Sequence, residues 1–177
     1  MQEIFDVLKE NGEYTNKTAT REECHEKGLW HRATVVVVMN SKNQILLQQR
    51  SKTKKLWSNM WDVSAGGHVL VGEFSYNTAI RETKEEIGLD ITEKDLLFIG
   101  SSCSTKIQGD IIDNHFNEYF IVTKDMDISK LELQTEEVQD IKWFGIEDLL
   151  KRIHNNYEGI TDKTGCWTCL AKYLETR

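Results

Sequence analysis

The sequence has no proline, and no apolar run in its 177 residues approaches the roughly 20 residues that a membrane-spanning helix needs. The longest apolar run, from Ala33 to Met39, is short and rich in β-branched residues, as is typical of a buried strand. The N-terminal residues lack the basic segment and apolar stretch of a secretory signal. The sequence therefore predicts a cytoplasmic protein that does not enter a membrane.

Basic residues are scarce as well, since 22 lysines and arginines stand against 29 aspartates and glutamates and give a formal net charge of −7. A negative protein repels the phosphate backbone, which argues against binding of a nucleic-acid polymer. An anionic substrate would therefore need a metal ion or a local basic cluster. The four cysteines are too dilute for a disulfide scaffold, and we interpret Cys166 and Cys169 as small apolar side chains rather than a redox or zinc motif.

Strand-like and helix-like patterns alternate along the chain, which predicts an α/β protein. We expect strands at 33–39, 44–49, 96–101, 118–122 and 138–144, and helices at 74–87, 146–154 and 166–175. A short extended segment, 62–65, is expected to break at Gly66-Gly67. The polar N-terminal part contains the turn signal Asn11-Gly12, which suits a small hairpin, although a short helix fits almost as well. We divide the chain into an N-terminal extension, 1–28, and one domain, 29–177.

The helix expected at 74–87 carries the most informative pattern. At about 100° per residue, Glu82, Glu85 and Glu86 fall on one face, opposite an apolar face. Like charges four residues apart repel by a few tenths of a kcal/mol even when they are exposed. One interpretation is a solvated acidic face. The other is a site for a hard divalent cation such as Mg²⁺, which prefers carboxylate oxygens and commonly carries substrate phosphates.

The segment around this helix resembles the box of the Nudix, or MutT-like, family, G-x5-E-x7-R-E-U-x-E-E-x-G-U, where U is aliphatic. Thr83 departs from an aliphatic position, and Leu89 fits the other. All the fixed positions are met, by Gly67, Glu73, Arg81, Glu82, Glu85, Glu86 and Gly88. The resemblance implies the Nudix fold, an α/β/α sandwich around a mixed β-sheet. It also implies an enzyme that hydrolyses a diphosphate linkage in small molecules of the type "nucleoside diphosphate linked to X", by attack of a metal-activated water.

By position, the resemblance assigns the catalytic cation, Mg²⁺ or Mn²⁺, to Glu82, Glu85 and Glu86, with Gly67 beside them. Arg81 belongs to the same catalytic group. It braces the loop and the helix against each other together with Glu73, while Gly67, Glu73 and Gly88 shape the box. The resemblance leaves open which carboxylate, inside or outside the box, takes the proton of the water.

The flanks of the box are similar to type 1 isopentenyl-diphosphate isomerases and to bacterial Nudix hydrolases that resemble them. The likeness lies in Trp30-His31-Arg32-Ala33, in the end of the second strand, and in Ser64-Ala65-Gly66-Gly67-His68. It implies a second metal site at His25, His31, His68 and Glu118, and it makes Arg50 and Lys54 ligands of the diphosphate. Isolated surface or core histidines, and a solvated basic loop at 50–55, are the alternatives.

Two departures favour a hydrolase over an isomerase. Gly66 stands where the isomerases have an acid–base cysteine, and the box is intact where theirs tends to be degraded. We therefore predict hydrolysis, with an isopentenyl-diphosphate isomerase and a non-catalytic diphosphate-binding module as the alternatives. The sequence leaves the identity of X open, and also the oligomeric state, for which a homodimer is the commonest assembly.

Overall fold

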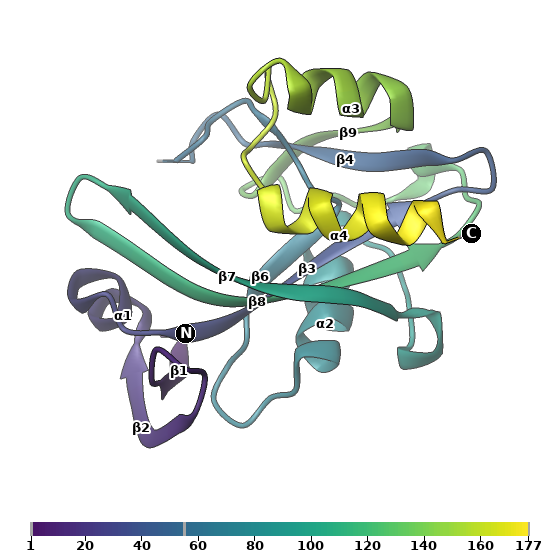
Figure 1. The fold of residues 1–177 in the computed structure, drawn as a ribbon. Coiled ribbons are helices and arrows are strands. Elements are labelled where there is room, and N and C mark those ends of the chain that lie inside the picture. Colours follow the sequence, from purple (N-terminus) through teal and green to yellow (C-terminus); the bar gives the residue numbers. More distant parts are fainter. Residues whose placement is uncertain (1, 55, 177) are drawn as a thin grey trace.

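The computed structural model describes residues 2–54 and 56–176, so that Lys55 of the basic loop lies outside the described residues. Figure 1 shows the elements in chain order. They are β1 (Ile4–Leu8), β2 (Tyr14–Thr20), α1 (Arg21–Lys27), β3 (His31–Met39), β4 (Gln44–Arg50), β5 (Trp61–Asp62), β6 (Ala65–His68), α2 (Ser75–Ile87), the 3-10 helix η1 (Glu93–Asp95), β7 (Leu97–Gln108), β8 (Ile111–Thr123), the 3-10 helix η2 (Ile128–Lys130), β9 (Val138–Gly145), α3 (Ile146–His154) and α4 (Thr164–Glu175).

Seven of these strands form one mixed sheet in the order β5-β4-β3-β8-β7, with β6 paired to β3 and β9 paired to β4. The β3–β8 pair is parallel, and the other pairs are antiparallel. Strands β3 and β4 pair only at Val38–Leu46 and Met39–Ile45. Beyond these two pairs the sheet divides into a β4–β5–β9 part and a β3–β6–β8–β7 part, which Figure 1 shows diverging.

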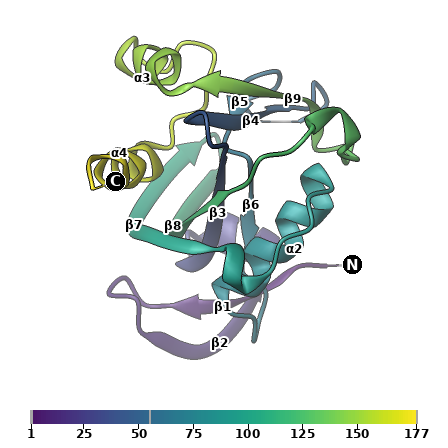
Figure 2. The same cartoon turned by 90° about the vertical axis from the view of Figure 1, so that its right-hand side faces the viewer.

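Helices cover both faces of the sheet, as Figure 2 shows for α2 and α4. The alternation of side chains along β3 explains why. Val35 and Val37 pack with Trp167 of α4, while Val36 and Val38 pack with Ala79 of α2. A strand that is buried on both faces reads as a continuous apolar run. The α/β/α sandwich around a mixed sheet, predicted from the family resemblance, is confirmed.

The N-terminal part forms the predicted hairpin, β1–β2, with Gly12 in the left-handed region at its turn. The short helix α1 follows it, whereas the sequence offered a helix only as the alternative to the hairpin. A capping box starts α1, since Thr20 accepts from the Glu23 amide and the Glu23 carboxylate accepts from the Thr20 amide. Figure 1 shows this helix against the β7–β8 hairpin.

The expectation that Gly66-Gly67 would end the extended segment is wrong, because β6 runs through both glycines and pairs with β3. Glycine is needed here for a close approach rather than for a turn. A Cβ at Gly66 would stand 2.7 Å from the carbonyl oxygen of Thr34, and one at Gly67 would overlap the carboxylate of Glu82. The pair therefore lets β6 lie against both the neighbouring strand and the acidic helix.

The strands expected at 96–101 and 118–122 are too short. Strands β7 and β8 continue as a long hairpin to Gln108 and Ile111. The added residues are mostly polar and half-exposed, so they carry no apolar run that a sequence pattern could detect. Among the described residues, no helix is both long and apolar enough to cross a membrane.

Candidate functional site

Helix α2 places the acidic residues of the box. It ends at Gly88, as predicted, where φ is 70° and the amide donates to the carbonyl oxygens of Lys84 and Thr83. Thr83 is fully buried in place of an aliphatic residue, and its hydroxyl donates to the carbonyl oxygen of Ala79 at 2.7 Å. A threonine is therefore accommodated on the apolar face because its polar atom is satisfied within the helix.

Glu86 is buried between α2 and the sheet. Its Oε2 accepts from Nε2 of Gln48 at 3.0 Å and from the amide of Gly66 at 3.1 Å. Burial, reinforced by the neighbouring charge of Glu82, raises the pKa of Glu86 to about 8. Burial also raises the pKa of Glu82, although Arg81 opposes that shift. The buried environment of Glu82 and Glu86 therefore disfavours the charged form of both carboxylates.

Arg81 links the helix to the loop that precedes it. Its Nη1 donates to Oε1 of Glu82 at 2.7 Å and to Oε2 of Glu85 at 3.2 Å, and its Nη2 donates to Oε2 of Glu73 at 3.3 Å. Ion pairs with these carboxylates outweigh burial and raise the pKa of Arg81. The guanidinium therefore fixes the direction of three carboxylates at once.

The box residues fit a hard divalent cation. Glu82 and Glu86 are buried and Glu85 is exposed, so the three carboxylates run from the interior to the surface of α2. Only a residue without a side chain at Gly67 leaves room for the Glu82 carboxylate against β6. A set of carboxylate oxygens is the donor set that Mg²⁺ and Mn²⁺ prefer. The structure thus places the three residues that the sequence assigned to the cation on one part of α2, where Arg81 contacts Glu82 and Glu85 and where Glu86 faces Gln48 and Gly66.

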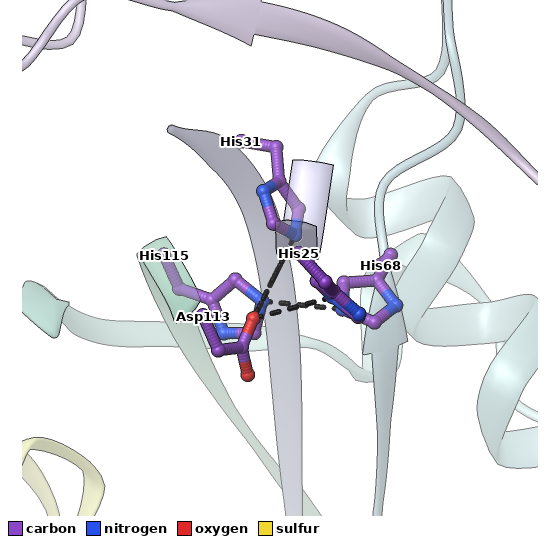
Figure 3. A group of neighbouring side chains, drawn as sticks. All are labelled: His25, His31, His68, Asp113 and His115. Atoms are coloured by element: carbon purple, nitrogen blue, oxygen red, sulfur yellow. Dashed lines mark hydrogen bonds and ion pairs between the residues drawn. The ribbon is translucent and has the colours of Figure 1, made fainter. Parts of the chain in front are cut away.

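A second group of ligand atoms converges near the start of β3, as Figure 3 shows. One ligand atom from each of five residues lies within 4.8 Å of the others. We call this group the histidine cluster. Its members come from α1, β3, β6 and β8, and they are His25, His31, His68, Asp113 and His115.

Three separations between ligand atoms of the histidine cluster match those of adjacent ligands around one ion, and two others are 2.7 Å and 3.9 Å. Nε2 of His115 lies 3.0 Å from Nε2 of His31, 3.1 Å from Nε2 of His68 and 2.7 Å from Oδ1 of Asp113. Oδ1 of Asp113 lies 3.4 Å from Nε2 of His25. Ligands about 2.1 Å from a common metal ion are separated by about 3.0–3.4 Å when they are adjacent in octahedral or tetrahedral sites.

The protonation of the cluster also suits a metal ion. Nδ1 of His31 contacts the carbonyl oxygen of Leu29 at 2.8 Å, which leaves Nε2 free to bind. Burial lowers the pKa of His31 to about 4 and holds the pKa of His68 well below its ordinary value, so both rings are neutral at pH 7. Nε2 of His25 and Oδ1 of Asp113 are buried without a hydrogen bond of acceptable geometry. The five residues therefore fit a transition-metal ion.

Glu118 is not brought into the histidine cluster, and Asp113 and His115 take its place. In the β3–β8 register, His31 pairs with His115 and Thr34 pairs with Glu118. These pairs are three positions apart, an odd number, so Glu118 lies on the opposite face of the sheet, the face of Gly67 and α2. The sequence prediction missed Asp113 and His115 because they precede the apolar run that marked this strand. Their spacing of two residues on one strand face was the signal that could have found them.

Arg50 and Lys54 are both engaged with acidic residues. Nη1 of Arg50 lies 3.3 Å from Oδ2 of the buried Asp62, and Nζ of Lys54 pairs with the carboxylate of Glu137. Asp62 carries a charge despite its burial, because Lys163 and Arg50 hold its pKa below the ordinary value. A diphosphate would have to displace these carboxylates from Arg50 and Lys54. Its larger negative charge would favour a bidentate contact with Arg50 over the contact with Asp62.

We expect the double variant Arg50→Ala, Lys54→Ala to raise KM for a diphosphate substrate by about tenfold or more, because each side chain removed is a charged hydrogen-bond donor. The turnover number should fall less. Lys52→Ala in the same loop is the matched control, since the Lys52 side chain is exposed. Steady-state kinetics measure the effect. An unchanged KM and kcat for the double variant would show that the loop is a solvated turn that does not bind the substrate.

Comparison with known proteins gives three findings. Residues 29–163 match the family model described as NUDIX domain. A Nudix hydrolase of Listeria innocua is 41% identical over 147 residues, which cover 83% of this chain and 82% of the relative. An isopentenyl-diphosphate Delta-isomerase of Photorhabdus laumondii is 31% identical over 156 residues, covering 88% of this chain and 84% of the relative.

A solved structure also resembles this one. The crystal structure of DR0079 from Deinococcus radiodurans has a TM-score of 0.70 at 23% sequence identity, and the match covers 90% of this chain and 94% of that one. At this identity the likeness is one of fold.

Proposed function

This chain belongs to the Nudix family and is a Nudix hydrolase, and from that premise we propose that it cleaves the diphosphate linkage of a nucleoside diphosphate joined to a further group. The observation that carries the proposal is the buried pair Glu82 and Glu86, with Glu85 beside them on the surface of α2. A pair of buried carboxylates without a matching pair of cations destabilises the fold, and a divalent cation removes that penalty.

The residues of the acidic helix have distinct roles in the proposed reaction. Glu82, Glu85 and Glu86 hold the cation, and Arg81 orients Glu82 and Glu85 from its contact with Glu73. A bound Mg²⁺ or Mn²⁺ would offset the charge of the diphosphate and lower the pKa of a water molecule. One carboxylate of this group, or Glu118 on the same face of the sheet, accepts the proton of the water.

The histidine cluster holds a second cation in this proposal. Its imidazole-rich donor set differs from the carboxylate set on α2, so the two sites select different metals. The five ligands join α1 to β3, β6 and β8. A metal ion at this position would therefore tie the N-terminal extension, 1–28, to the domain, 29–177.

Isomerisation is the second candidate, because the isomerase relative aligns over most of the chain. The reaction needs two acid–base groups, one at each end of an allyl unit. Gly66 supplies none, and a side chain there would meet the carbonyl oxygen of Thr34. Loss of a positioned acid–base group lowers a rate by about 10²–10⁴-fold. The close approach of Thr34 therefore excludes the acid–base side chain that isomerisation needs at position 66, which favours hydrolysis.

The proposal is tested with a panel of nucleotide sugars, nucleoside di- and triphosphates, dinucleotides, coenzymes and isopentenyl diphosphate. We expect at least one diphosphate to be hydrolysed with Mg²⁺ or Mn²⁺ and to be stable with a chelator. Phosphate and nucleoside monophosphate are measured, and NMR follows isopentenyl diphosphate. Formation of the dimethylallyl isomer at enzymatic rates, with no hydrolysis of any compound, would favour the isomerase. Binding without any turnover would favour the non-catalytic module. A cytoplasmic location and a homodimer stay predictions.

A further inference from the structure

A group of cationic side chains gathers at the open side of the divided sheet, apart from the two candidate metal sites. Arg50 ends β4, Lys106 lies near the tip of β7, and Lys163 immediately precedes α4. Figure 1 shows the loop after β4, the β7–β8 hairpin and the first turn of α4 on the same side of the molecule. Sequence patterns did not single out Lys106 or Lys163, because neither belongs to a basic run.

Asp62 lies in the middle of this group but does not balance it. Its Oδ2 lies 3.3 Å from Nη1 of Arg50, and its Oδ1 lies 4.0 Å from Nζ of Lys163. Asp62 also accepts a hydrogen bond from Oγ1 of Thr161 at 2.6 Å. The other nearby carboxylate, Asp162, accepts from the amide and hydroxyl of Thr164 at the start of α4. Asp62 and Asp162 are therefore both already hydrogen-bonded, and Asp113, which acts on Lys106, belongs to the histidine cluster.

Lys106 is the cation with the least compensation. Its Nζ donates to the main-chain carbonyl oxygen of Asp162. Among residues 2–54 and 56–176, no carboxylate oxygen lies within 4.0 Å of this nitrogen. Burial, together with the charge of Lys163, lowers the pKa of Lys106 against the opposing charges of Asp162, Asp62 and Asp113. A half-buried ammonium beside a second ammonium is stabilised by an anion, just as the carboxylates of α2 are stabilised by a cation.

Trp57 forms one wall of this group. Nζ of Lys106 lies 5.0 Å from the centre of its ring, and Cζ of Arg50 lies 5.9 Å from it. The backbone of Trp57 has a φ of 52°, which is uncommon for a bulky residue. The loop after β4 thus holds the ring between cations that come from two different strands.

The position of the group relates it to both candidate sites. Lys106 pairs directly with Asp113 across the hairpin, so both side chains lie on the sheet face of the histidine cluster. On the other side, Asp62 pairs with Gln48, which donates to the Glu86 carboxylate. One strand pair therefore connects the cationic group to each candidate site, Lys106–Asp113 to the histidine cluster and Asp62–Gln48 to Glu86.

We propose that Lys106 and Lys163, with Arg50 and the Trp57 ring, form an anion subsite that takes a phosphoryl group of the substrate. This inference rests on the proposed hydrolysis and adds residues to it. The chemistry is that of a tetrahedral oxyanion with at least two charges, since point-charge lysines suit such a group. A phosphoryl group can come from the substrate or from free inorganic phosphate, and the experiment below separates these two sources.

The binding arm uses tryptophan fluorescence in a chelator, with methylenediphosphonate and inorganic phosphate as probes. We expect Lys106→Met and Lys163→Met each to weaken binding of methylenediphosphonate by about tenfold or more, because each removes a charged hydrogen-bond donor. Lys172→Met is the matched control, since Lys172 is exposed on α4. Trp57→Phe should remove most of the fluorescence response, and Lys106→Arg should restore binding if Lys106→Met proves unstable.

The kinetic arm measures KM for whichever diphosphate the protein hydrolyses. A higher KM for the two methionine variants, with kcat changed less, supports a subsite for the substrate. Weaker phosphate binding with an unchanged KM would overturn it, because the site would then hold free phosphate. Unchanged affinity for both probes would overturn it as well. Glu86→Gln should still bind methylenediphosphonate. The binding arm therefore tests the anion subsite even if the protein hydrolyses no diphosphate.

Discussion

Glu86→Gln is expected to lower the turnover of diphosphate hydrolysis by about 10²–10⁴-fold and to leave the fold intact. The amide oxygen of glutamine can accept the two hydrogen bonds that Glu86 receives from Gln48 and Gly66. What the variant loses is the negative charge that binds the cation. Glu85→Gln should also lower turnover strongly, because that side chain lies beside the pair. Glu147→Gln on the exposed side of α3 is the matched control.

The same variant should change how the metal-free protein depends on pH. The pKa of Glu86 is raised to about 8, so its protonated form favours the folded state. Its contribution is fully present below the pKa of the unfolded carboxyl, near 4.5, and is lost as the pH rises through about 8. In chelator, the wild-type protein should therefore lose about 1–3 kcal/mol of unfolding free energy between these pH values, more than Glu86→Gln loses.

Urea denaturation in chelator at several pH values measures this effect. Added millimolar Mg²⁺ should remove much of the difference between the wild-type protein and the variant, because a ligand that binds only the folded state stabilises it. Full activity in both Glu85→Gln and Glu86→Gln would show that the carboxylates are not catalytic. A pH dependence that is identical in the wild type and in Glu86→Gln would contradict the raised pKa of Glu86.

The second large effect is expected at the histidine cluster. His68→Ala and His31→Ala should each remove a bound transition metal from the purified protein and lower its thermal midpoint by on the order of 5–10 °C. The reason is that the ion would join four elements, among them α1, which contacts the rest of the protein mainly through β8 and the β1–β2 hairpin. Elemental analysis gives the metal content, and a thermal scan gives the midpoint.

His154→Ala is the matched control for the cluster, since His154 lies exposed at the end of α3 and is outside the group of ligand atoms. It should leave metal content and thermal midpoint unchanged. Protein that holds no transition metal at all, even after incubation with Zn²⁺ or Mn²⁺, would reduce the cluster to a set of packed histidines. In that case the loss of His68 would act through its ring contacts with Phe5 and the neighbouring histidines.

Local sequence signals predicted much of α2, and the family resemblance assigned its carboxylates to a cation. The spacing of Glu82, Glu85 and Glu86 and the stop at Gly88 are properties of one helix, and a helix repeats every 3.6 residues wherever it lies. The sheet was harder. Gly66-Gly67 resembled a break because glycine is rare inside strands, and only the approach of Thr34 and Glu82 explains why the strand needs it.

The second site and the anion group depend on pairing between distant strands. Whether Glu118 or His115 reaches the histidines is decided by one residue of register, which turns a side chain to the other face of a sheet. Lys106 reaches Trp57 only because the β7–β8 hairpin lies near the loop after β4. No pattern within either segment contains that information.

The central claim is that water attacks phosphorus at the carboxylates of α2. It is tested most directly by hydrolysis of the best substrate of the panel in ¹⁸O-labelled water with Mg²⁺, in the wild type and in Glu86→Gln. We expect the wild type to place one ¹⁸O atom in one phosphoryl product and the variant to form that product about 10²–10⁴-fold more slowly. Equal rates of labelled product from both proteins, or product without label, would contradict the claim.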